Sequence, residues 1–235
     1  ENQIPEYSKF YFINGEKIAP VGFSGSGLLA APFLFIGNIL DNVLNYSEKP
    51  FNFKIIFYSL SSIFYLTVSA ILLQKSFLLQ NKDIRKTTVL LLLSGSGVAY
   101  FALERFSMTH VYEVFINALI IYLSTAAFQT RKDIYFALIP FSIFLGLLVK
   151  LSNFYIVLIP LIIKELLDLN ISNKIFNFKN RVNFLVGFLL STILFIYVNF
   201  KIYGKVILNP SETYSAQSQL SNYLESSFNI VEFVL

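Results

Sequence analysis

The residues best suited to chemistry lie in segment 103–123, which reads LERFSMTHVYEVFINALIIYL. His110, Glu113, Asn117 and Ser124 follow one another in steps of three, four and seven residues, so a helix would place them on one face. A polar stripe on an apolar helix is costly against lipid and should face a bundle interior or a watery cavity. His110 at the start of this stripe is a candidate for proton transfer.

Two further charged residues, Glu104 and Arg105, precede this stripe by a few positions. Together with His110 they would place an acid, a cation and an imidazole near one opening at the membrane surface. A structural interpretation stays open beside this one. Asn117 and Ser124 would then hydrogen-bond neighbouring helices, and Glu104 and Arg105 would belong to a solvated loop.

Lys150 is the second candidate, because it interrupts the thirty-residue apolar run 134–163 together with Ser152 and Asn153. One helix of that length would be too long, so the sequence predicts two helices that meet at a tight turn. An ammonium group in such a turn suits the phosphate of a lipid and could neutralise a departing phosphate. The alternative is that Lys150 lifts its amine to the lipid headgroups.

The elements that must position these residues are long apolar runs separated by short basic loops. Such runs must be helices in lipid, because no water satisfies their backbone groups. The sequence therefore predicts an all-α, polytopic transmembrane helix bundle with about six spanning helices. The runs are Phe51–Leu73, Val89–Leu103, Val111–Phe128, Ile134–Val149, Phe154–Leu167 and Phe184–Tyr203.

The basic residues fall in every second loop, which orients the bundle. An excess of Lys and Arg marks the cytoplasmic side, so the loops around Glu104–His110 and Lys150–Asn153 should face outward. We expect a multi-pass protein of a bacterial inner membrane with its active face outward. The cytoplasmic set is Lys75, Lys82, Arg85, Lys86, Arg131, Lys132, Lys164, Lys174, Lys179 and Arg181.

Three regions are expected along the chain. Residues 1–50 would form an outer loop with an interfacial helix, 51–203 the transmembrane bundle, and 204–235 an outer loop with the start of a further apolar segment. Segment Gly22–Leu44 is apolar enough to enter a membrane, but its glycines and Pro32 favour a helix lying at the interface. The pairs Gly27 with Ala31 and Gly95 with Ala99 have the spacing of close helix packing.

Composition excludes several classes of site. The chain has no Cys and a single His, which rules out thiolate catalysis, disulfides and a metal site built from Cys or several His. The net charge of +4 is explained by the basic loops, so we expect no nucleic-acid partner. A requirement for a divalent metal stays open.

Four segments in consistent order resemble the GT-C membrane glycosyltransferases, the class of protein O-mannosyltransferases and of aminoarabinose transfer to lipid A. KIAPVGFSGSGLLAAPFLFIG resembles the stretch after their first outer loop, and ERFSMTHVYEVFINALIIYL resembles their second outer-loop element. GLLVKLSNFYIVLIPLI resembles a recurrent segment that would place Lys150 and Asn153 at its Arg and Asn. Tyr203-Gly204 resembles the start of a later outer loop.

The resemblance implies inverting sugar transfer from a polyprenyl-phosphate donor on the outer face, with a carboxylate as general base. Lys150 would lie near the donor phosphate, Asn153 and Glu113 would bind substrate, and Arg105 and His110 would occupy the second outer-loop element. The principal acid of the family would precede Glu1, in a longer protein. At the second acidic position this chain has His110, and Glu104 and Glu113 are the nearby substitutes.

Two other functions remain open at this point. The replacement by His110 also fits a non-catalytic structural subunit that contacts other membrane subunits. A transporter would need ionisable groups near the bilayer midplane and corresponding broken helices in two halves. The polar groups here gather at the predicted outer face instead, which ranks the transporter below the other two.

Overall fold

The computed structural model describes residues 11–14, 17–20, 24–44, 46, 52–106, 108–167, 178–204 and 206. Contacts divide the chain into two units: one runs from Ser24 to Phe195, and the other comprises Glu1–Phe23 and Ile196–Leu235. All candidate site residues belong to the first unit. Of the predicted outer tail, 204–235, only Gly204 and Val206 lie within the described residues.

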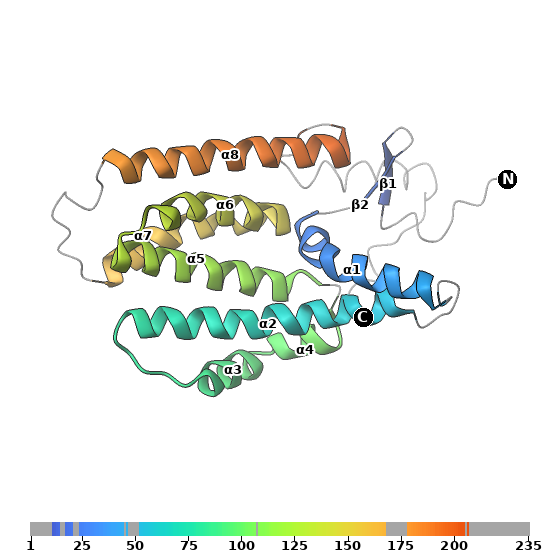
Figure 1. Ribbon diagram of the computed structural model, residues 1–235, viewed down its shortest axis with the longest axis horizontal. Helices are drawn as coiled ribbons and strands as arrows, with labels where there is room; N and C mark the ends of the chain where they lie inside the picture. The colour runs from blue at the N-terminus through green and yellow to red at the C-terminus, as the bar shows by residue number, and fades with distance from the viewer. Residues whose placement is uncertain are drawn as a thin grey trace, which may run out of the picture. The chain divides into compact units, whose positions relative to one another are not determined.

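Helices make up nearly all of the described regular structure (Figure 1). The strands β1 (Tyr11–Asn14) and β2 (Lys17–Pro20) form one antiparallel hairpin. The helices are α1 Gly25–Val43, α2 Phe53–Leu79, α3 Lys86–Gly95, α4 Val98–Leu103, α5 His110–Thr130, α6 Asp133–Val149, the 3₁₀ helix η2 Leu151–Leu158, α7 Ile159–Leu166 and α8 Phe178–Tyr203.

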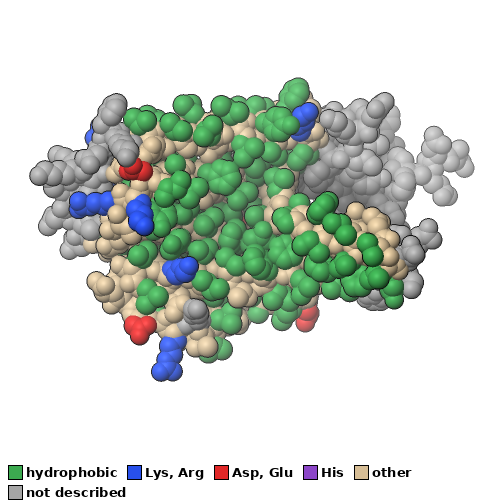
Figure 2. All heavy atoms as spheres, in the orientation of Figure 1, with side chains coloured by type: hydrophobic (Ala, Val, Ile, Leu, Met, Phe, Trp, Pro, Cys, Tyr) green, Lys and Arg blue, Asp and Glu red, His purple; other side chains and the backbone are tan. Residues whose placement is uncertain are grey.

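Four of these helices are long and apolar enough to cross a membrane, judged by length and composition. They are Gly25–Val43, Phe53–Leu79, His110–Thr130 and Asn180–Tyr203, and α6 is a shorter apolar helix. Hydrophobic side chains also cover much of the described surface in Figure 2. A surface of this kind is stable against lipid and not against water, so the chain has the character of a membrane protein.

Helix α5 lies at the centre of the Ser24–Phe195 unit and packs against α2, α6 and α7. It is the most buried of the four long helices: 67% of its most apolar stretch is buried, against 33% or less in the others. Tyr112, Ile116 and Ile120 on α5 are almost fully buried. The central place agrees with the polar residues of α5, because a helix carrying Glu113 and Asn117 is costly against lipid.

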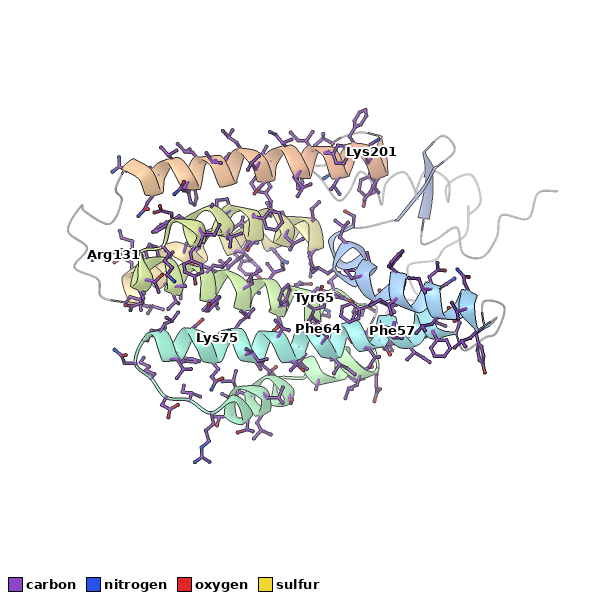
Figure 3. All side chains as sticks on the ribbon, viewed as in Figure 1. Phe57, Phe64, Tyr65, Lys75, Arg131 and Lys201 are labelled. Atoms are coloured by element: carbon purple, nitrogen blue, oxygen red, sulfur yellow. The ribbon has the colours of Figure 1, made fainter. Side chains whose placement is uncertain are left out.

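Hydroxyl groups on α2 fix its neighbours. Ser61 Oγ lies 2.9 Å from the Tyr112 hydroxyl on α5, and the Tyr65 hydroxyl donates to the Leu29 carbonyl on α1 at 2.9 Å. Tyr65 lies between α2 and α5 in Figure 3, and its ring centroid is 5.5 Å from that of Tyr112. Hydrogen bonds of this kind specify helix pairing in lipid, where burial of apolar surface gives no preference.

Helix α1 runs antiparallel to the first half of α2. Its first residue, Gly25, packs so closely on the end of α6 that an added Cβ would lie 2.3 Å from the Val149 backbone nitrogen. Near its other end, buried Asp41 caps α2, accepting hydrogen bonds from the Phe53 and Lys54 N–H groups at 2.7 and 3.2 Å. The start of α5 meets α2 at Ser61, whereas α1 follows α2 from Tyr65 back to Phe53, so most of α1 extends beyond the N-terminal end of α5.

The outward side of α1 is apolar. Pro32 lies inside the helix without ending it. The predicted close packing at Gly27 is wrong for the described part of the chain, where an added Cβ would meet no atom within 4 Å. The large exposed side chains are Leu28, Phe35, Ile36, Ile39 and Val43.

The predicted helix Val89–Leu103 is wrong as a single span. It divides into α3 and α4 at Gly97, whose φ of 81° is left-handed and interrupts the helix. Gly95 also lacks the predicted close contact, since an added Cβ would meet none of the described residues within 4 Å. Helix α4 is held instead by Ser62 on α2, whose hydroxyl donates to the Ala102 carbonyl at 2.6 Å.

The two helices predicted to meet near Lys150 are present as α6 and the η2–α7 segment. Lys150 makes the turn with extended backbone angles, φ −164° and ψ 118°. The second helix begins with the 3₁₀ segment Leu151–Leu158, which is kinked at Asn153 (φ −77°, ψ 20°), and continues as the α-helix Ile159–Leu166.

Candidate functional site

The candidate site centres on Glu113, in the first turn of α5. Its Oε1 accepts a hydrogen bond of 2.5 Å from Thr109 Oγ1, lies 3.5 Å from Lys150 Nζ and lies 3.8 Å from His110 Nδ1. The Glu113 side chain is 13% exposed, whereas those of Lys150 and His110 are 37% and 45% exposed. A shielded carboxylate thus lies beneath two more accessible groups that can carry positive charge.

The sequence brings these groups together through the α5–α6 hairpin. The two helices are joined by the short turn at Arg131 and Lys132, so the start of α5 lies beside the end of α6. Lys150 stays at the end of α6 because its N–H donates to the Gly146 carbonyl at 3.0 Å. Glu113 in a first turn is favoured by the positive end of the helix dipole.

The arrangement suits a ligand that carries negative charge. Lys150 can approach a phosphate oxygen once its ammonium leaves Glu113, and the freed carboxylate can then accept a proton. His110 packs on the Phe101 ring, with centroids 4.3 Å apart, so one side of the imidazole is covered.

The structure does not bring Glu104 and Arg105 into contact with this cluster. Within the described part of the chain, the exposed Glu104 side chain makes no hydrogen bond or ion pair, and Arg105 Nε donates to the Tyr100 hydroxyl at 3.2 Å. Both follow α4 on the preceding loop. Asn153 is 3% exposed and lies in the first turn of η2, where its N–H donates to the Lys150 carbonyl at 3.0 Å.

Two residues of the site were not expected from the sequence. Thr109 donates to Glu113, and Tyr155 contacts Asn117, with 3.5 Å between its hydroxyl and Asn117 Nδ2. Thr109 sits four residues before Glu113, a spacing that could have pointed to it. No signal marked Tyr155, because its position depends on the 3₁₀ geometry of η2.

The described residues hold no group of three or more His, Cys, Asp or Glu side chains arranged for a metal ion. No family model, curated protein or solved structure matches the chain. The function must therefore be argued from the site itself.

Proposed function

We propose that this chain is part of a membrane glycosyltransferase of GT-C type, which transfers a sugar from a polyprenyl phosphate to an acceptor at the outer membrane face. The observation that carries the proposal is the Lys150–Glu113–His110 cluster at one end of the bundle. Transfer from a lipid-linked donor needs a cation that binds the donor phosphate and a base that deprotonates the acceptor. The cation and the base must both lie at the membrane surface.

In this proposal Lys150 binds the donor phosphate and stabilises its charge as the bond to the sugar breaks. Glu113 takes the proton of the attacking hydroxyl, with His110 holding the acceptor or serving as the base in its place. Inversion follows from attack on the side of the sugar opposite the phosphate. Glu104 and Arg105 are proposed to contact substrate from the loop before α5, and Asn153 from η2.

The position and surface of helix α1 support the proposal that the substrate is carried on a lipid. It begins against Val149, next to Lys150, and exposes the apolar side chains Phe35, Ile36 and Ile39 along its length. We propose that α1 lies in the outer interface and borders the path by which the donor's tail reaches the site. The same face would contact membrane lipids when no donor is bound.

A second function is supported by the pairing of Lys150 with Glu113. The two charges neutralise each other, and Thr109 adds a hydrogen bond, so the cluster is stable without a ligand. This arrangement fits a non-catalytic subunit of a larger membrane complex, in which the pair joins α5 to the α6 end.

The experiment that separates the two functions compares Lys150→Ala with Lys164→Ala. Both lysine side chains are 37% exposed and each pairs with one glutamate, Lys164 with Glu165 at 3.8 Å. If Lys150 binds the donor phosphate, Lys150→Ala should lower sugar transfer in membranes at least about a hundredfold, while Lys164→Ala leaves it unchanged. Equal rates in both variants, with the fold intact, would contradict the enzyme and favour the structural subunit.

A further inference from the structure

Asn117, one helical turn inward from Glu113, has a buried amide oxygen with no hydrogen-bond partner among the described residues. Its amide nitrogen makes one long contact, 3.5 Å, with the Tyr155 hydroxyl. Exchanging the oxygen and nitrogen of the amide would only move the unpartnered atom to the other position. Buried polar groups normally find partners, because leaving one unpaired costs free energy.

The position of this amide relates it to the candidate site. Asn117 follows Glu113 by four residues, so their Cβ atoms lie about 5–6 Å apart on one face of α5. Tyr155 belongs to η2, which begins directly after Lys150. The Asn117–Tyr155 pair and the Glu113–Lys150 pair therefore both link α5 to the chain at or just after Lys150, the charged pair nearer the start of α5. Tyr155 is 45% exposed, whereas the Asn117 amide oxygen is buried, so a ligand reaches that oxygen only when the long contact with Tyr155 opens.

We propose that Asn117 and Tyr155 hydrogen-bond hydroxyl groups of the sugar on the lipid-linked donor, and so select for the sugar. This inference rests on the proposed function, in which the donor phosphate lies at Lys150. A sugar hydroxyl both donates and accepts, so it can donate to the amide oxygen and pair with the phenol. The Asn117–Tyr155 contact at 3.5 Å is long enough to exchange for such hydrogen bonds.

The test measures binding of two probes to the full chain in lipid nanodiscs: a polyprenyl phosphate without sugar, and the same lipid carrying one hexose. Asn117→Leu keeps the number and branching of the side-chain heavy atoms and removes both polar atoms. We expect it to raise the Kd of the hexosyl lipid about tenfold, as for one or two lost hydrogen bonds, and to leave the Kd of the sugar-free lipid unchanged. Tyr155→Phe, which removes a single hydroxyl, should shift the hexosyl lipid alone and by less.

Ser124→Ala is the matched control, because its hydroxyl lies seven residues further along α5 and is also buried without a partner among the described residues. It should change neither Kd. If Asn117→Leu weakens both lipids equally or neither, the inference is overturned, and an ordered water or a helix contact occupies Asn117 instead. If the unaltered chain binds neither lipid, the proposed function itself fails.

Discussion

At the scale of single residues, Glu113 rather than His110 is the centre of the candidate site. Its carboxylate is the common partner of Thr109, Lys150 and His110, and it is the least exposed of the three charged or titratable groups. Thr109 holds this carboxylate in place, and the ion pair with Lys150 must open before the carboxylate accepts a proton. The proposed chemistry therefore predicts different roles for the acid and the cation.

Glu113→Gln should separate these roles. We expect sugar transfer to fall by about 10²–10⁴-fold, the usual contribution of a general base. Binding of a sugar-free polyprenyl phosphate should stay equal or become tighter, because Lys150 loses its counter-charge. Turnover in membranes and lipid binding in nanodiscs measure the two effects.

The control for this variant is His110→Gln, which leaves the Lys150–Glu113 pair in place. Loss of transfer in His110→Gln with normal turnover in Glu113→Gln would make His110 the base. Loss of lipid binding in Glu113→Gln would contradict the idea that the carboxylate competes with the phosphate for Lys150.

At the scale of elements, two glycines of α1 give a matched test of how this helix is placed. Gly25→Ala would bring a Cβ within 2.3–2.4 Å of Val149 and Leu148 backbone atoms, whereas Gly27→Ala meets open space. We expect Gly25→Ala to destabilise the fold by roughly 1–3 kcal/mol, as overpacking does. Gly27→Ala should be neutral or stabilising by up to about 1 kcal/mol, because alanine favours helix.

Thermal unfolding in detergent measures both glycine variants. Equal melting temperatures would mean that the start of α1 does not rest on the end of α6. The proposed position of α1 beside Lys150 would then be lost as well.

The sequence predicted those helices whose approximate bounds follow from a long apolar run alone. The runs that became α2, α5, α6 and α8 were recognised, as was the turn at Lys150. It could not reveal that Gly97 takes a left-handed φ, which divides Val89–Leu103 into α3 and α4. It also could not separate α-helix from 3₁₀ helix after Lys150, since both place apolar residues in a similar pattern.

The part of the candidate site that lies on α5 could be predicted, because helical spacing determines which residues share a face. Steps of three and four residues placed His110, Glu113 and Asn117 on one face of α5. The directions of Glu104 and Arg105 depend on the loop between α4 and α5, whose course follows from packing rather than from local pattern. Among the described residues, neither side chain makes a hydrogen bond or ion pair with Glu113.

At the scale of the whole molecule, the basic loops predict an orientation in the membrane. Lys75 and Arg131 lie toward the same end of the Ser24–Phe195 unit (Figure 3), while the Lys150 turn and the start of α5 lie at the other. The excess of Lys and Arg predicts that the Lys75–Arg131 end is cytoplasmic. The candidate site would then face outward, as transfer from a lipid-linked donor on that face requires.

Single cysteines can test this orientation cleanly, because the chain has none of its own. Asp83→Cys lies in the exposed loop between α2 and α3, and Met108→Cys replaces a 44% exposed side chain just before α5. In intact cells a membrane-impermeant maleimide should label Met108→Cys and should reach Asp83→Cys only after permeabilisation. Arg131→Cys should behave like Asp83→Cys, because Arg131 lies toward the same end of the Ser24–Phe195 unit as Lys75, near the start of that loop. If intact cells label Asp83→Cys and not Met108→Cys, the orientation is the reverse of the predicted one. The Glu113 cluster would then lie on the cytoplasmic side, where the proposed outward transfer could not occur.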